Sequence, residues 1–117
     1  VVDNDKYNIE DERVMLVEDS LKTLQSLATY HRKSLNIPVI ALTGSNGKTT
    51  TKELIKTVLA KKYVTNSTKG NLNNHIGVPL TLLELNSNHE IALVEMGDNH
   101  PKQKHQSLRH LFRIELV

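Results

Sequence analysis

Residues 43–53, TGSNGKTTTKE, combine the residue types that bind a polyphosphate. Gly44 and Gly47 allow the backbone to turn tightly and bring its N–H groups close to an anion. Lys48 is suited to reach the β- and γ-phosphates of a nucleotide, and the hydroxyl of Thr49 is suited to coordinate Mg²⁺. A lysine in the first turn of a helix is electrostatically unfavourable unless an anion is bound. We therefore expect a nucleotide site here rather than an ordinary turn between a strand and a helix.

The loop departs in one place from the general pattern for such sites. That pattern, G-x-x-x-x-G-K-[ST], requires a glycine five residues before Gly47, where this chain has Leu42. Gly-Lys-Thr, which carries most of the specific chemistry, is kept. An apolar, strand-like run precedes the loop and an amphipathic, helix-like segment follows it, as the motif requires.

Glu95 is a second candidate, because it lies near the end of the apolar run IALVEM at residues 91–96. In open α/β sheets the ligand crevice lies at the carboxyl ends of the strands. If residues 39–42 (VIAL) and 91–96 form parallel neighbouring strands, the loop and Glu95 meet at one edge, where a carboxylate suits Mg²⁺. Taken alone, Glu95 would be interpreted as an ordinary strand-end glutamate in water; beside the loop, the metal role is favoured.

The elements that position these residues are expected to alternate between strands and helices. Apolar runs predict strands at residues 13–18, 39–42, 63–65 and 91–96, and the run 39–42 is expected to be buried on both faces. Helical spacing predicts helices from Asp19 or Ser20 to about Lys33, over 50–62, over 78–85, and from near Pro101. In the second of these, one apolar side is expected to hold Leu54, Ile55, Val58 and Leu59. Residues 34–38 are expected to be a linker and 66–77 a polar loop, and the order of elements predicts an α/β fold with a parallel sheet.

Composition narrows the function classes. The absence of cysteine excludes disulfides and thiolate metal sites. Basic residues are in excess only in residues 101–117, and with 3% aromatic residues there is no stacking surface for bases, so nucleic-acid binding is disfavoured. The polar, acidic N-terminus does not resemble a signal peptide, and no apolar stretch approaches the roughly 20 residues of a membrane span. We therefore expect a soluble, cytoplasmic protein.

Three successive motifs resemble those of the Mur ligases: TGSNGKTTTKE, TKGNLNNHIGVPLTLLEL and EMGDNHP. The spacing T-G-x-x-G-K-T is normal in that family, which accounts for Leu42. The resemblance covers roughly residues 12–101 and implies an α/β fold, a P-loop-type parallel sheet with flanking helices. It also implies three parts. Residues 1–37 would be the end of an N-terminal substrate-binding domain and linker, 38–100 the front part of an ATP-binding central domain, and 101–117 a basic tail that does not match the family.

The resemblance implies an ATP-dependent amide-forming ligase that activates a carboxylate as an acyl phosphate, with ATP and Mg²⁺ as cofactors. GNLNNHIGVP and EMGDNH are similar to the branch that adds D-Ala-D-Ala to UDP-N-acetylmuramoyl-tripeptide in peptidoglycan synthesis. Lys48 would be the catalytic residue, and Thr49 and Glu95 the Mg²⁺ ligands. The implied phosphate-binding residues are Gly44, Ser45, Asn46, Gly47, Lys48, Thr49 and Thr50. The residues implied to line the substrate crevice are Asn73, Asn74 and His75.

Two further interpretations stay open at this point. One is a related ligase that polyglutamylates folate, which GNLNNHIGVP argues against. The other is a non-catalytic nucleotide-binding or inert fragment, because the adenine-binding and amine-binding parts of the family have no counterpart here. We expect the isolated chain to lack the full activity and the full-length enzyme to be monomeric. Of the six histidines, His75 and His100 are expected near the crevice, and the remaining four on the surface: His31, His89, His105 and His110.

Overall fold

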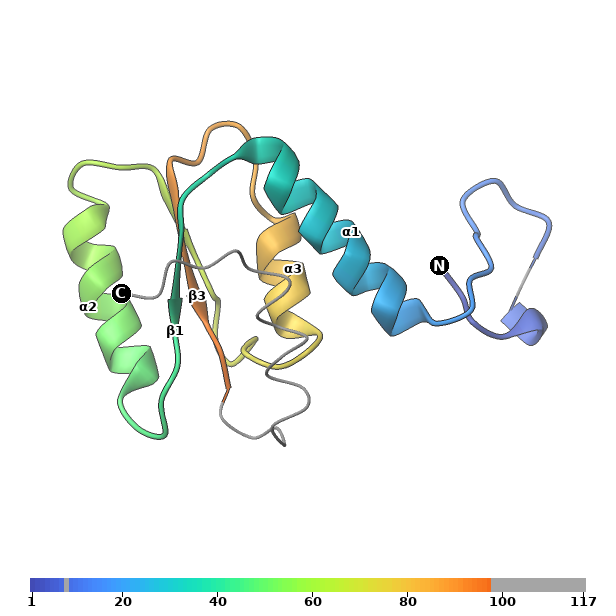
Figure 1. The fold of residues 1–117 in the computed structure, drawn as a ribbon, viewed down its shortest axis with the longest axis horizontal. Coiled ribbons are helices and arrows are strands. Elements are labelled where there is room, and N and C mark those ends of the chain that lie inside the picture. Colours follow the sequence, from blue (N-terminus) through green and yellow to red (C-terminus); the bar gives the residue numbers. More distant parts are fainter. Residues whose placement is uncertain (8, 98–117) are drawn as a thin grey trace.

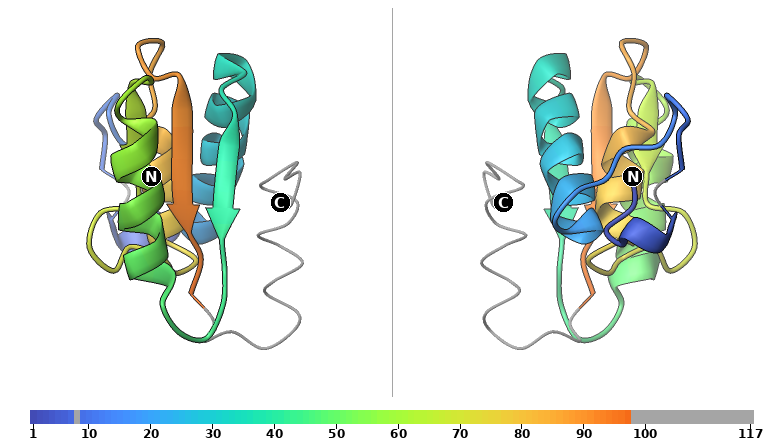
Figure 2. Two further views of the ribbon diagram at one scale, coloured as in Figure 1. Left: turned by 90° about the vertical axis from the view of Figure 1, so that its left-hand side faces the viewer. Right: turned by 90° about the vertical axis from the view of Figure 1, so that its right-hand side faces the viewer.

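The computed structural model describes residues 1–7 and 9–97, which form a sheet covered by helices on both faces, with an extended N-terminal arm (Figure 1). In chain order the elements are η1 (Asp5–Tyr7), α1 (Ser20–Leu35), β1 (Val39–Leu42), α2 (Lys48–Leu59), β2 (Thr65–Ser67), α3 (Gly77–Leu83) and β3 (Ile91–Glu95). Helices α1 and α3 lie on one face of the sheet and α2 lies on the other (Figure 2). The α/β architecture predicted from the sequence is confirmed.

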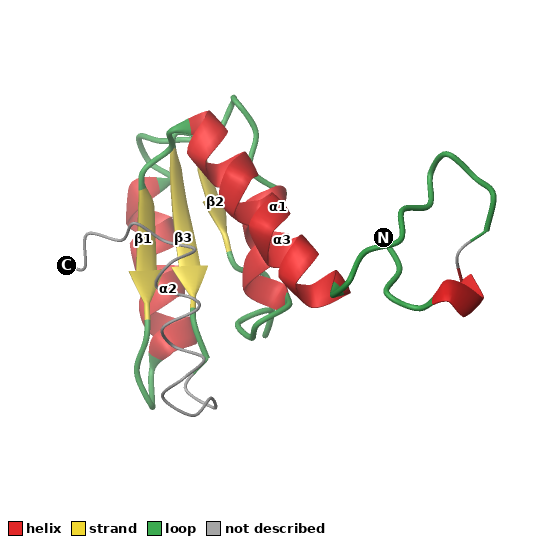
Figure 3. Ribbon diagram, turned by 45° about the vertical axis from the view of Figure 1, so that its right-hand side comes forward, coloured by secondary structure: helices red, strands yellow, loops and turns green. Residues whose placement is uncertain are grey.

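The sheet has the strand order β1-β3-β2, and both pairs are parallel (Figure 3). Leu42 at the end of β1 is in register with Glu95 at the end of β3. The loop that follows β1 and the carboxylate of Glu95 therefore reach the same edge of the sheet, as the sequence predicted. The helix expected near Pro101 lies outside the described residues.

The central strand β3 separates the apolar core from the polar site by the alternation of its side chains. Ala92, Val94 and Met96 are buried in a hydrophobic cluster with residues of α1 and α3. The side chains between them, Leu93 and Glu95, point to the opposite face, which α2 covers. The alternation thus places one carboxylate on the α2 side of an otherwise apolar strand.

Helix α1 begins and ends close to where the sequence predicts. The Asp19 carboxylate caps its first turn by accepting from the Lys22 N–H at 2.9 Å, and Asn36, in the left-handed region at φ 50°, ends it. The arm is joined to this start by Asp3, which accepts from the Ser20 hydroxyl at 2.6 Å. That bond favours the ionised form and lowers the pKa of the Asp3 carboxyl.

Removing the N-cap of α1 is expected to destabilise the chain modestly. Asp19→Ala leaves an N–H group of the first turn without its side-chain acceptor, so the free energy of unfolding should fall by about 1 kcal/mol. Urea unfolding followed by circular dichroism measures the change. Asp19→Asn keeps an acceptor oxygen and should lose less; an equal loss in both variants would show that the charge, and not the cap, matters.

Three strand predictions need correction. Residues 13–18 form no strand; Leu16 makes a single bridge to Val2, and Met15 and Leu16 stay exposed, because the arm offers no sheet to cover them. The strand predicted at 63–65 lies at Thr65–Ser67, because Tyr63 still belongs to the turn that ends α2 and bonds back to Leu59. Residues 39–42 are only half-buried, since β1 is an edge strand of the described sheet.

Helix α2 turns a different face to the sheet from the one its apolar spacing predicts. Leu54 and Val58 are 65% and 71% exposed, whereas Lys52 is the buried residue of this helix. Ile55, one turn after Lys52, is half-buried as expected. Contacts of Thr49 and Lys52 with the end of β3 and the loop after β2 therefore set the rotation of the helix. As a result, two residues of the predicted apolar side are half-buried and two are exposed.

Candidate functional site

The loop between β1 and α2 is shaped by two glycines with positive φ angles. Gly44 has a φ of +144° and Gly47 a φ of +75°, a region that side-chain-bearing residues rarely adopt. Gly47 occupies the N-cap of α2 and offers no side-chain acceptor, so no side chain caps the first-turn N–H groups. Lys48 folds back over the loop and donates to the Gly44 carbonyl. The helix N-terminus and its lysine together form a positively polarised end suited to an anion.

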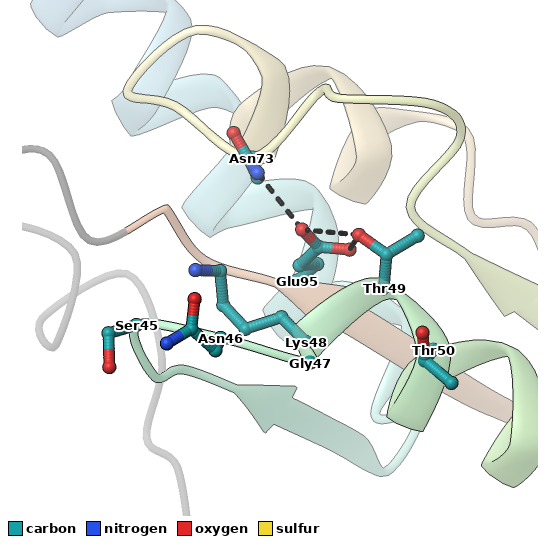
Figure 4. A pocket seen from close by; sticks show the side chains of 8 residues that line it. All are labelled: Ser45, Asn46, Gly47, Lys48, Thr49, Thr50, Asn73 and Glu95. Carbon is teal, nitrogen blue, oxygen red and sulfur yellow. Dashed lines mark hydrogen bonds between the residues drawn. The ribbon is translucent and has the colours of Figure 1, made fainter.

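Glu95 is buried at the mouth of this loop rather than exposed to water, with 2% of its surface accessible. Its carboxylate accepts from the Thr49 hydroxyl at 3.1 and 3.2 Å and from the Asn73 side-chain amide at 3.0 Å (Figure 4). These bonds join three elements: the start of α2, the end of β3 and the loop before α3. An ordinary solvated glutamate would show none of this burial.

A pocket of about 350 Å³ opens beside these residues. Its walls bring together most of the residues that the sequence singled out, as Figure 4 shows. The lining residues are Ser45, Asn46, Gly47, Lys48, Thr49, Thr50, Asn73 and Glu95. Gly44 does not line the pocket, but its carbonyl accepts a hydrogen bond from the Lys48 ammonium.

The remaining sequence candidates make other contacts. The Asn74 side chain accepts from the N–H groups of Ile76 and Gly77 at 3.1 and 2.8 Å, which organises the start of α3. The His75 carbonyl accepts from Gln25 of α1 at 3.2 Å. Neither Asn74 nor His75 lines the pocket, and His100 lies outside the described residues.

Sequence reasoning missed two buried residues beneath the pocket, Lys52 and Thr68. The Lys52 ammonium donates to the Thr68 carbonyl at 2.8 Å and lies 3.7 Å from the Glu95 carboxylate. The Thr68 hydroxyl accepts from the Glu95 N–H at 2.9 Å. One signal was available: Lys52 follows Lys48 by four residues, which puts both on the same side of a helix.

The oxygen atoms at the pocket suit a hard cation. Carboxylate and hydroxyl oxygens are available from Glu95 and Thr49, and Mg²⁺ is usually bound by one or two such groups with phosphates and waters completing its shell. Within residues 1–7 and 9–97 no cluster of three His, Cys, Asp or Glu side chains could bind a metal alone. A cation here would therefore have a shell completed by water or by a bound phosphate.

The fold and the loop together define an α/β domain of the P-loop type. Residues 42–116 match the family model described as Mur ligase middle domain. The chain therefore belongs to the Mur ligase family, in agreement with the resemblance of its three motifs.

Within that family, the chain is similar to curated ligases of one type. The chain is 52% identical over 88 residues to the UDP-N-acetylmuramoyl-tripeptide–D-alanyl-D-alanine ligase of Bacillus subtilis, and 53% identical over 82 residues to that of Synechocystis. These matches cover 75% and 70% of this chain but 19% and 18% of the relatives. The chain thus spans about a fifth of the length of these curated relatives.

Solved structures of ligases in the same family have a similar fold over most of this chain. A ligase of this type from Acinetobacter baumannii superposes with a TM-score of 0.80 at 40% identity, covering 91% of this chain and 24% of that one. The MurF ligase of Thermotoga maritima, solved in complex with ADP, gives a TM-score of 0.74 at 36% identity, over 89% of this chain and 23% of that one. In the described part of the chain, no helix has the length and apolarity to span a membrane.

Proposed function

We propose that this chain provides the phosphate-binding part of an ATP-dependent ligase that adds D-Ala-D-Ala to UDP-N-acetylmuramoyl-tripeptide. The observation that carries the proposal is the buried Glu95, which accepts from Thr49 at the mouth of the glycine loop. The names of the Bacillus and Synechocystis relatives support the substrates, because both share more than half of the aligned residues. The ADP complex of the Thermotoga relative supports the nucleotide.

In this proposal the loop acts by positioning and by neutralising charge. The N–H groups at the start of α2 and the Lys48 ammonium bind the phosphates, with Ser45, Asn46 and Thr50 on the pocket wall. Transfer of the γ-phosphoryl group to the terminal carboxylate of the tripeptide would release ADP and give an acyl phosphate, and attack by the amine of D-Ala-D-Ala would form the amide and release inorganic phosphate. Phosphoryl transfer needs little covalent help from the protein, so fixed donors and cations account for most of the catalysis.

Magnesium fits the residues present. Glu95 offers a buried carboxylate and Thr49 a hydroxyl within 3.2 Å of it, both at the pocket, and we assign these two as its ligands. When bound, the ion would neutralise charge on the phosphates. Asn73 orients Glu95 through its amide, and Asn74 and His75 stabilise the loop that presents Asn73 to the substrate crevice.

We also retain the division of the chain as part of the proposal. Residues 1–37 would close a substrate-binding domain, 38–100 would begin the ATP-binding domain, and 101–117 would be a basic tail, although the family model extends to residue 116. The arm lies apart from the sheet, whereas α1 packs against α3 and contributes Ala28 to the core of the sheet, so the packing supports separation of the arm but not of α1 (Figure 1). A cytoplasmic, monomeric full-length enzyme completes the proposed function.

A chimera tests the assignment. The 88 matched residues of this chain replace the corresponding segment of the Bacillus subtilis ligase, and ADP formation is measured with UDP-N-acetylmuramoyl-tripeptide, D-Ala-D-Ala and Mg·ATP. We expect turnover that requires both substrates, within about tenfold of the parent enzyme. In parallel, the 117-residue chain is tested for binding of a fluorescent ADP analogue.

The two measurements separate the alternatives. A folded chimera without D-Ala-D-Ala-dependent turnover would refute the ligase role, and ADP binding by the chain would then favour a non-catalytic nucleotide-binding segment. Absence of both would leave an inert fragment.

A further inference from the structure

Lys52 presents a buried charge that the proposed reaction does not use. Its side chain is 1% exposed, and it lies on the inner side of α2 between the sheet and the loop that follows β2. The ammonium has three oxygen neighbours: the Thr68 carbonyl at 2.8 Å, Glu53 at 3.2 Å and Glu95 at 3.7 Å. A buried lysine needs such partners, because an uncompensated charge inside a protein is strongly unfavourable.

The buried carboxylate of Glu95 likewise needs a partner of opposite charge. Its other side-chain partners, Thr49 and Asn73, are neutral donors, so Lys52 supplies the charge closest to the carboxylate among the ion pairs of the described residues. Lys52 has two carboxylate partners, Glu95 and Glu53, and the side chain of Glu53 is 54% exposed. Glu95 has only one charged partner, Lys52, among the ion pairs of the described residues. If a cation takes over the charge of Glu95, Lys52 keeps Glu53 and the Thr68 carbonyl.

We propose that Lys52 is the internal counter-ion of Glu95 and that its charge makes divalent-cation binding at Glu95 depend on a bound nucleotide. The inference rests on the proposed function, in which Glu95 is the metal ligand and the loop binds phosphates. Without nucleotide, the Glu95 carboxylate has the Lys48 ammonium beside it in the pocket lining and the Lys52 ammonium 3.7 Å away. The exposed Glu53 offsets only part of this positive charge, so a dication is bound weakly. A nucleotide brings several negative charges and reverses this balance. Lys52 is therefore a positioning residue, which acts on the metal through Glu95.

The test measures Mn²⁺ binding to the 117-residue chain by the electron paramagnetic resonance signal of free Mn²⁺, with and without ADP. Mn²⁺ prefers the same oxygen ligands as Mg²⁺. In the unchanged chain we expect weak binding that ADP tightens. In Lys52→Met, loss of one nearby positive charge should tighten Mn²⁺ binding without ADP by about tenfold and reduce the effect of ADP. A merely structural lysine would give weaker or unchanged binding.

Matched variants isolate the charge. Lys52→Arg keeps the charge and should behave like the unchanged chain, and Lys52→Met with Glu95→Gln should lose the gain. If Lys52→Met alone does not fold, the counter-ion role predicts that Mn²⁺ restores its circular dichroism and that the double variant folds without metal. Mn²⁺ binding in Lys52→Met no tighter than in the unchanged chain, or failure of both rescues, would overturn the proposal. If the unchanged chain does not bind ADP and the chimera also shows no turnover, it is the proposed function that fails.

Discussion

Replacing Lys48 with methionine is expected to lower the turnover number of the chimeric ligase by about 10²–10³-fold. Methionine keeps much of the length of the side chain but removes the ammonium that lies over the loop beside the pocket. Phosphoryl transfer concentrates negative charge between the β- and γ-phosphates, and a fixed cation at that point stabilises the transition state most. ADP formation in the chimera, with both substrates saturating, is the measurement.

The matched control is Lys61→Met, which makes the same change of charge at an exposed residue just after the C-terminal end of α2. It should leave turnover unchanged within about twofold. Turnover of the Lys48 variant within threefold of the unchanged chimera would contradict the role assigned to this lysine. Fluorescent ADP binding to the 117-residue chain with Lys48→Met shows whether nucleotide affinity falls with turnover.

The central features of the site could be predicted from the sequence because they depend on local rules. A glycine loop between an apolar run and an amphipathic segment predicts a strand, a loop and a helix N-terminus. The structure has β1 before the loop, Gly47 at the N-cap of α2 and Lys48 as the first residue of that helix. Glu95 required only one non-local assumption, that two apolar runs are parallel neighbours, and the register of Leu42 with Glu95 bears this out. The role of each of these residues remains a proposal.

The contacts beneath the pocket could not be predicted, because they depend on how α2 is rotated against the sheet. Apolar spacing favoured the side with Leu54 and Val58, yet the helix buries Lys52 instead. The Thr68 carbonyl and Glu95 offer that lysine partners that are far from it in the sequence. A periodicity argument treats a lysine as a surface residue and has no means of foreseeing such partners.

The strands at 39–42 and 91–95 were predicted correctly, but the strand at 13–18 and the burial of 39–42 were not, for a related reason. Apolar residues at 13–18 meet the local criterion for a strand, but a strand also needs a neighbour, and Val2 supplies only one bridge to Leu16. Likewise, VIAL was expected to be covered on both faces, whereas the position of β1 at an edge of the described sheet leaves it half-buried. Pairing partners and sheet order are properties of the whole fold.

Replacing Gly77, the first residue of α3, with alanine is expected to cause a larger loss of stability than alanine at Gly70 in the loop before this helix. A Cβ atom at Gly77 would lie 2.5–2.6 Å from three backbone atoms of Leu72, a distance that real contacts do not reach. Backbone atoms cannot yield as a flexible side chain can, so the whole loop must move. Overpacking of this kind costs about 1–3 kcal/mol and occasionally more, and we expect the upper end of that range.

The loop that would move carries Asn73, whose amide donates to Glu95 and whose carbonyl accepts from the Gly97 N–H at 2.6 Å. Gly77→Ala should therefore also lower turnover of the chimera, because Glu95 loses the donor that orients it. Gly70→Ala is the matched control: its Cβ would meet nothing within 4 Å, so only its φ of +53° opposes alanine, at a cost of about 1–2 kcal/mol. Urea unfolding of the two 117-residue variants compares them directly. Gly77 has no positive φ, so a loss of stability no larger than that of Gly70→Ala would show that close approach to Leu72 is not what requires glycine at Gly77.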